Sequence, residues 1–170
     1  MAQVKHPTVI FGCGNVLMGD DGFGPAVIEE LKTRHILPDN VTAVDAGTGI
    51  REYLFDYLLA PDTRPERLII LDAVDFPDRR PGEVFSVDVS LLPAQKIHDF
   101  SLHQFPSVNL LLELQEHTGI TVDILAAQIE VIPEEISPGL SSAMTGAVSL
   151  ACEKIFQRLS ASRRTQGEQP

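Results

Sequence analysis

The sequence has 170 residues, of which 44% are hydrophobic and 22% charged, and it carries a formal net charge of −11. This composition is that of a globular protein, so it excludes a disordered or fibrous chain, and the length fits a single domain. The negative charge argues against nucleic acid and anionic membrane surfaces as partners. It favours a cation or a basic segment of another protein.

Targeting and redox signals are weak. The first residues lack the apolar stretch and cleavage site of a signal peptide, and no apolar run approaches the ~18 residues that span a membrane. The two cysteines, Cys13 and Cys152, cannot build a disulfide framework and lack the spacing of a structural zinc site. We therefore expect a soluble, cytoplasmic protein.

The first half of the chain predicts two strands that alternate with two helices. Residues 8–12 are apolar and rich in β-formers, which is typical of a buried strand. After a glycine-rich loop, a helix is expected from about Pro25, since proline suits a first helical turn. Residues 41–45 predict a second strand, which leads to a helix carrying Leu54 and Leu58.

The second half continues this alternation. Residues 67–72 are apolar until the last position, which is typical of a strand covered on both faces in a parallel sheet. Residues 83–89 predict another strand, and a helix carrying Val108 follows and stops at Thr118. Residues 121–129 predict the last strand.

A final helix is expected to begin at Ser137-Pro138, a good N-cap followed by proline. Six apolar residues mark one face of this helix: Leu140, Met144, Ala147, Ala151, Ile155 and Leu159. We expect one domain over residues 1–160 and a polar, flexible tail over residues 161–170. The alternation of strands and helices predicts a three-layer α/β domain.

The loop between the first strand and helix, GCGNVLMGDDGFGP, lies where nucleotides are often bound. The dinucleotide fingerprint begins with Gly12 and Gly14 but meets Leu17 where its third glycine is required. The phosphate-loop pattern meets Asp20 and Asp21 where lysine and a hydroxyl residue are required, and two carboxylates would repel phosphate. The loop therefore does not predict a nucleotide site.

Acidic side chains gather instead at the carboxyl ends of the predicted strands, where open α/β sheets bind ligands. Asp20 and Asp21 follow the first strand, and Asp72 closes the strand at 67–72. Each could merely cap a helix or form a salt bridge, although one helix needs only one capping residue. A carboxylate beside a buried strand is costly unless it is paired or bound.

Histidine and cysteine offer further candidates. His98 and His103 flank DFSL just before a predicted helix, and their spacing does not decide between them; no HExxH pair is present. His6, His35 and His117 fit solvated positions. Cys13 could serve as a nucleophile, or it could be a small residue where the chain packs closely. Cys152 fits a buried apolar position.

Five blocks in order complete the pattern: GCGNVLMGDDGFGP, AGTGI at 46–50, LIILDAVD at 68–75, SLHQ at 101–104 and IEVIPEEISPGLS at 129–141. Together they resemble the hydrogenase maturation endopeptidases along nearly the whole chain, excepting the polar tail. The glycine-loop block is highly specific, and the other four are weaker individually. The first block is most similar to the proteases encoded with deazaflavin-reducing hydrogenases of methanogens, and formate-linked hydrogenase proteases share MGDDG.

The resemblance implies a twisted five-strand, mostly parallel sheet with helices on both faces. It also implies that Asp21, Asp72 and His103 bind metal and act in catalysis, which resolves the choice of histidine. Some family members carry glutamate at the position of Asp21. The metal that the resemblance implies is nickel, which the substrate is expected to supply and the free enzyme not to hold tightly.

The implied activity is removal of the C-terminal extension from a nickel-loaded nickel-iron hydrogenase large-subunit precursor. Such a peptide hydrolase could be of the aspartic type, and we expect a monomer or weak oligomer. The main competing hypothesis is a nickel-dependent assembly chaperone that binds the precursor without cutting it. Two weaker hypotheses are a flavodoxin-like nucleotide-binding module and a thiol hydrolase that uses Cys13.

Overall fold

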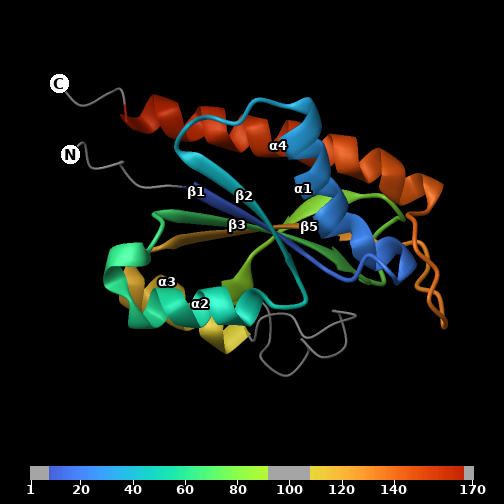
Figure 1. The fold of residues 1–170 in the computed structure, drawn as a ribbon, viewed down its shortest axis with the longest axis horizontal. Coiled ribbons are helices and arrows are strands. Elements are labelled where there is room, and N and C mark those ends of the chain that lie inside the picture. Colours follow the sequence, from blue (N-terminus) through green and yellow to red (C-terminus); the bar gives the residue numbers. More distant parts are fainter. Residues whose placement is uncertain (1–7, 92–107, 167–170) are drawn as a thin grey trace.

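A five-stranded sheet forms the centre of the molecule (Figure 1). The computed structural model describes residues 8–91 and 108–166. Within them the strand order is β2-β1-β3-β5-β4, with β4 antiparallel at one edge and the other strands parallel. The strands are β1 Thr8–Cys13, β2 Val41–Gly47, β3 Arg67–Val74, β4 Val84–Val87 and β5 Thr121–Gln128.

Helices cover both faces of this sheet (Figure 1). Helices α1 and α4 pack on one face, and α2 and α3 on the other. Their bounds are α1 Phe23–Arg34, α2 Ile50–Leu59, α3 Val108–Thr118 and α4 Ser142–Gln166, with 3₁₀ turns at Gly19–Gly22, Pro61–Thr63 and Val89–Leu91. The predicted α/β class, with its five-strand, mostly parallel sheet, is confirmed. No described helix is long and apolar enough to cross a membrane.

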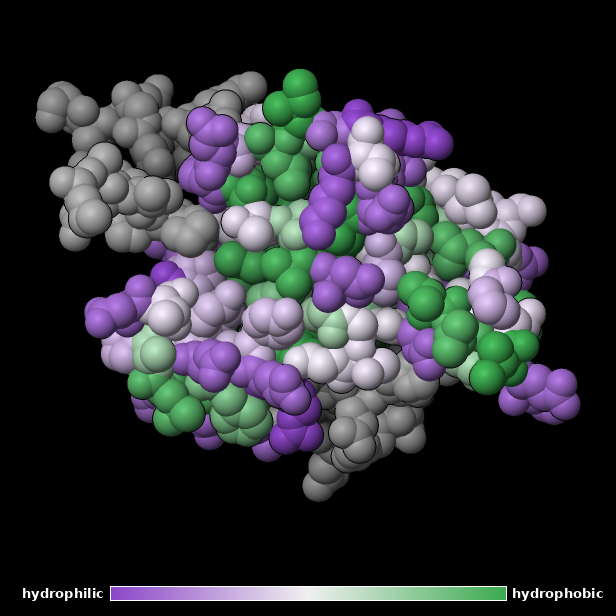
Figure 2. Space-filling model, viewed as in Figure 1, coloured by the Kyte–Doolittle hydropathy of each residue, from purple (hydrophilic) through white to green (hydrophobic). Residues whose placement is uncertain are grey.

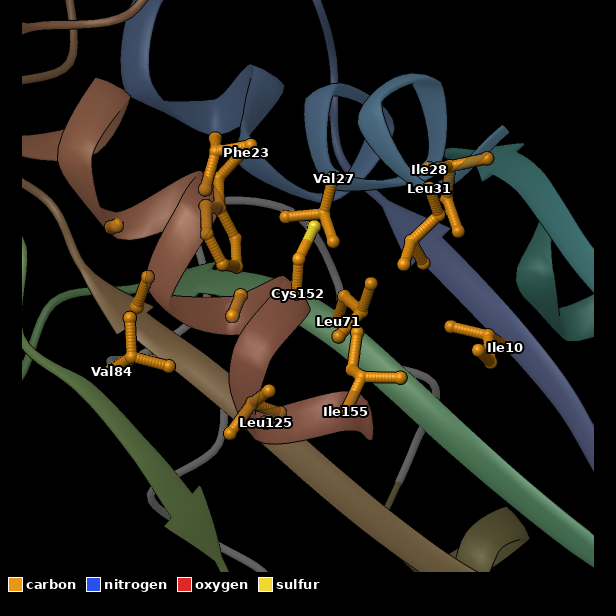
Figure 3. Packing of buried hydrophobic residues seen from close by; sticks show 14 of the residues in the cluster. Ile10, Phe23, Val27, Ile28, Leu31, Leu71, Val84, Leu125, Cys152 and Ile155 are labelled. Atoms are coloured by element: carbon orange, nitrogen blue, oxygen red, sulfur yellow. The ribbon is translucent and has the colours of Figure 1, made fainter. Parts of the chain in front are cut away.

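The core has two halves, one on each face of the sheet. Alternate residues of β3 contribute to each, so that Leu71 packs with α1 and α4 while Ile70 packs with α2 and α3. Figure 3 shows the first half, where Phe23 and Val27 of α1 face the strands beside α4. Continuous burial on both faces explains why this strand is apolar throughout.

The ends of β3 and β4 differ from expectation in ways that affect the site and the sheet edge. β3 continues to Val74, so Asp72 lies within the strand and pairs with Ala126 of β5 rather than closing it. The strand expected over 83–89 is wrong beyond Val87, where the chain turns into a short 3₁₀ helix. β4 lies at the sheet edge and pairs with β5 alone among the described strands, so no strand on its other side extends it.

The predicted start of the final helix is also wrong. α4 begins at Ser142, and the hydroxyl of Ser141 accepts a bond from the Met144 N–H at 3.3 Å. The backbone of Ser137 is used elsewhere, since its carbonyl accepts from the Gly19 N–H and its own N–H donates to the Leu17 carbonyl. α4 also runs to Gln166, so residues 161–166 are helical where a flexible tail was expected.

Two glycines let α1 lie directly against the strands. A Cβ on Gly24 would lie 2.5 Å from the Cys13 nitrogen and 2.8 Å from the Leu71 carbonyl oxygen, both of which are backbone atoms. A Cβ on Gly12 would likewise meet the Gly24 carbonyl and lie 2.5 Å from Ile28 Cγ1. Gly12, which begins the nucleotide-like pattern, and Gly24 therefore serve close packing of helix on strand.

We predict that Gly24→Ala lowers the free energy of unfolding by roughly 1–3 kcal/mol, because the added carbon overlaps backbone that cannot move aside. Gly146→Ala is the matched control. Gly146 lies inside α4, and a Cβ added there would meet nothing within 4 Å, so alanine should stabilise the protein by about 0.5–1 kcal/mol. Urea denaturation of both variants tests the claim, and equal effects of the two substitutions would contradict it.

Candidate functional site

The loop after β1 folds back so that its backbone holds the side chain of Asp21. Gly14 takes a φ of 131°, and a side chain there would overlap the Asp21 carbonyl oxygen. The Asn15 N–H donates to Asp21 Oδ2 at 2.7 Å. Asn15 Oδ1 in turn accepts from the Leu17 N–H at 3.0 Å, which fixes the turn. The glycine and the asparagine therefore orient one carboxylate.

The neighbouring aspartate, Asp20, has a structural role. The Asp20 carboxylate accepts four bonds from the segment before α4, namely from Glu130 N at 2.9 Å, Val131 N at 3.3 Å, Ser141 N at 2.7 Å and Ser141 Oγ at 3.0 Å. The 3₁₀ turn that contains both aspartates has no side-chain cap of its own. Asp20 thus fastens a distant loop to the glycine loop, a role that the sequence did not reveal.

Asp72 lies at the same edge of the sheet, one residue beyond the last β1–β3 pair, which joins Gly12 to Leu71. It is 6% exposed, and its Oδ1 accepts from the Ala73 N–H at 2.9 Å. Burial, and secondly the charge of Asp21, raise the pKa of Asp72 well above its usual value. The structure therefore brings the two predicted acids close enough to repel each other when both are ionised.

Cys13 completes this buried group and faces the same half of the core as α2 and α3. Burial raises the pKa of Cys13 well above that of a free thiol, and Asp72, Asp45 and Asp21 raise it further. A reactive cysteine requires the opposite, a positive environment that favours the thiolate. The environment thus favours the interpretation of Cys13 as a small packed residue over that of a nucleophile.

The other sequence candidates fall into two groups. His35, just after α1, and His117, in α3, are exposed, whereas His6, His98 and His103 lie outside the described residues. Cys152 is buried in the core beside α1, as expected. Burial and the nearby charge of Glu30 raise the pKa of Cys152 to about 12.

Buried carboxylates in this arrangement can bind a cation or share a proton. Each ionised carboxylate raises the cost of ionising its neighbour, and a divalent ion removes that cost by attracting both. Asp21 and Asp72 are 1% and 6% exposed, so water screens their repulsion poorly. The donor set fits a small, positively charged ligand at the carboxyl edge of β1 and β3.

A hollow of about 320 Å³ lies beside this group. It is bounded by the glycine loop at Val16, by the start of α1 at Pro25, by Asp45 near the end of β2, and by Gly139 and Leu140 before α4. Neither Asp21 nor Asp72 lines it. The hollow is large enough for a side chain of a bound peptide next to the acidic pair.

Gln128 is a second position that sequence reasoning missed. It is 4% exposed at the end of β5, where its Oε1 accepts from the Phe76 N–H at 2.7 Å. Its Nε2 donates to Asp75 Oδ1 at 2.9 Å. The side chain thereby fixes the loop that follows β3. The sequence feature that could have identified Gln128 is an amide side chain at the end of an apolar strand.

Comparison with known proteins identifies the family. The family model for hydrogenase maturation proteases matches residues 25–158, which include Asp72 and His103 but not the glycine loop. A putative hydrogenase maturation protease of Methanocaldococcus jannaschii is 39% identical over 153 residues, covering 89% of this chain and 96% of that protein. The coenzyme F420 hydrogenase subunit delta of Methanothermobacter thermautotrophicus is 34% identical, covering 89% and 90%.

A solved structure agrees. The hydrogenase maturating endopeptidase HybD of Escherichia coli superimposes with a TM-score of 0.70 at 29% identity, covering 92% of this chain and 93% of that one. The similarity extends along the whole α/β domain and is not confined to a single motif. The family that the sequence blocks indicated is therefore confirmed.

The burial of Asp72 predicts how the stability of the folded state depends on pH. Because its pKa is raised by folding, the folded state binds more protons than the unfolded state, and stability falls as pH rises above the unfolded pKa of about 4. We predict that, in chelator, Asp72→Asn is close to wild type near pH 4. At pH 8 the variant should melt higher, by about 2–4 °C for each kcal/mol recovered.

Asp123→Asn serves as the control for this experiment. Asp123 Oδ2 accepts from Arg67 Nε at 2.6 Å, so losing its charge should lower the melting temperature at pH 8. Thermal unfolding monitored by circular dichroism at the two pH values separates the effects. A lower melting temperature for Asp72→Asn at pH 8 would contradict the prediction, because it would mean that the ionised Asp72 carboxylate stabilises the folded state.

Proposed function

The chain belongs to the hydrogenase maturation protease family, and from that membership we propose that it removes the C-terminal extension of a nickel-iron hydrogenase large-subunit precursor once nickel has been inserted. The observation that carries the proposal is the pair of buried acids Asp21 and Asp72 at one edge of the sheet. We propose that both bind the nickel that the precursor carries.

His103 is the third proposed ligand. Two carboxylate oxygens and an imidazole suit a borderline divalent ion, and they leave positions for ligands from the substrate. His103 precedes the first residue of α3, Val108, by five positions in the sequence. Helix α3 packs on the face of the sheet that also carries Cys13, the neighbour of Asp72. His98 lies in the same connection to α3, so the choice of His103 rests on the resemblance to the family.

Bound nickel would offset the mutual repulsion of Asp21 and Asp72. Without it, their mutual repulsion and burial favour protonation of Asp72. With it, both carboxylates are neutralised, and the precursor is held only if the metal is present. When bound, the nickel would supply Lewis-acid chemistry at the scissile carbonyl, and the Asp72 oxygen that does not bind it would accept the proton of the attacking water as general base.

The surface beside the acids fits a protein substrate. Four exposed apolar side chains lie on the two loops that Asp20 joins, and they are Val16, Leu17, Val131 and Ile136. Figure 2 shows apolar residues gathered at the end of the molecule where Figure 1 draws the loop before α4. Exposed apolar groups beside a polar site are typical of a surface that binds another protein. We propose that the precursor extension lies along these loops and enters the adjacent hollow.

Substitution of each proposed ligand tests the function. We expect Asp21→Asn, Asp72→Asn and His103→Ala each to lower the rate of precursor cleavage by about 100-fold or more, because each removes a group that acts on the metal or the water. A time course of processing on nickel-loaded precursor, followed by gel electrophoresis, gives the rates. Circular dichroism confirms that each variant is folded.

Asp123→Asn and His117→Ala are the matched controls, since they change the same residue types away from the acids. Both should cleave within about threefold of wild type, since His117 is exposed and Asp123 lies near the start of β5, away from the carboxyl edge. Full cleavage by folded Asp72→Asn would remove its role as ligand or base. Binding of the precursor by wild type without any cleavage would instead favour an assembly chaperone.

A further inference from the structure

A second group of possible metal ligands lies where the end of α1 packs against α4. It consists of the Glu30 carboxylate on α1, the imidazole of His35 just after α1, and the Cys152 thiol on α4. One ligand atom from each lies within 4.8 Å of the other two. Figure 3 shows the Cys152 sulfur directed toward α1 beside Val27. Only the fold brings these residues together, since 117 positions of sequence separate His35 from Cys152.

This group is distinct from the acids at the carboxyl edge. Asp21 precedes the first residue of α1, whereas His35 follows the last one. The helix between them has 12 residues, which corresponds to about 18 Å at 1.5 Å per residue. A metal bound at one end of α1 therefore cannot share ligands with the other end.

Each side chain of the group is already held in place. The Ser149 hydroxyl donates to Glu30 Oε1 at 3.2 Å, which ties the carboxylate to α4. The His35 ring lies 5.1 Å from the Phe156 ring, centroid to centroid. Cys152 is 1% exposed and sits in the core between α1 and α4. Ordering of the ligands therefore costs little when an ion binds.

The combination of donor atoms is selective for ions such as Zn²⁺. A thiolate, an imidazole and a carboxylate are the ligands that Zn²⁺ prefers, at about 2.3, 2.0 and 2.0 Å respectively. Tetrahedral geometry at these lengths places ligand atoms roughly 3.3–3.5 Å apart. The observed upper limit of 4.8 Å requires a shift of about 1 Å, which an exposed imidazole can supply. A hollow of about 820 Å³ adjoins His35, so water can complete the coordination.

We propose that Glu30, His35 and Cys152 bind Zn²⁺ or a similar borderline divalent transition ion at the α1–α4 contact. On binding, the Cys152 sulfur forms a bond to the metal and its proton leaves to solvent. The ion thereby links the first helix to the last, and it stabilises the folded state because the unfolded chain has no such cluster. The hard ion Mg²⁺ does not bind there, since it requires oxygen ligands.

Cobalt is the probe for this site, because a thiolate bound to Co²⁺ gives a charge-transfer absorption in the near ultraviolet. Chelator-treated full-length protein is titrated with Co²⁺, and Zn²⁺ is then added. We expect the absorption to appear, to saturate, and to be removed by Zn²⁺. Zn²⁺ should raise the melting temperature by a few degrees, and Mg²⁺ should have no effect.

Four variants test which residues bind the Co²⁺ that gives the absorption. Cys152→Ala should abolish the absorption, and His35→Ala should weaken Co²⁺ binding by roughly tenfold or more. Cys13→Ala and Asp72→Asn should both retain the signal, because they lie at the other end of α1. His35 is exposed, so its substitution leaves the core intact. Absence of the absorption in wild type, its persistence in Cys152→Ala, or unchanged affinity in His35→Ala would overturn the proposal.

Discussion

The candidate site depends on one buried carboxylate that does not belong to its chemistry. Asp20 receives bonds from Glu130, Val131 and Ser141, which lie 110 to 121 positions away in sequence. Bonds to a charged acceptor are each worth about 1.5–3 kcal/mol, and breaking them would leave several donors buried without partners. These bonds fix the loop before α4 against the glycine loop. They therefore set the position of Asp21, the hollow and the apolar loops together.

Asp20 and Asp72 thus divide two tasks that usually conflict. A carboxylate satisfied by four donors is stable but has little capacity left for a ligand, as in Asp20. Asp72 is the opposite case, buried near Asp21 with a raised pKa, so that ionisation is costly without a cation. The buried charge of Asp72 lowers the stability of the folded state at the position where the function is proposed, which is a recurrent feature of active sites. The precursor's metal would offset that cost only while it is bound, which makes recognition conditional on nickel.

The sequence predicted the centre of the sheet well because β1, β3 and β5 are buried on both faces and have nearly continuous apolar sequences. It placed Asp21 and Asp72 at the same edge of the sheet because chain direction brings the carboxyl ends of parallel strands together, although Asp72 lies within β3 and not after it. It failed at Ser137, whose good capping chemistry is overridden by a long-range backbone pairing with Met18. It could not reveal the role of Asp20 or the cluster around Cys152, since both depend on contacts between distant segments. His103 was chosen by resemblance, and it lies outside the described residues.

The most direct test of nickel-dependent processing is the intact mass of a large-subunit precursor before and after incubation with this protein. Nickel-loaded and nickel-free forms of the same precursor are compared side by side. The proposed function predicts loss of the C-terminal extension from the nickel-loaded form alone. Equal cleavage of both forms would contradict nickel recognition, and an unchanged mass in both would contradict proteolysis itself.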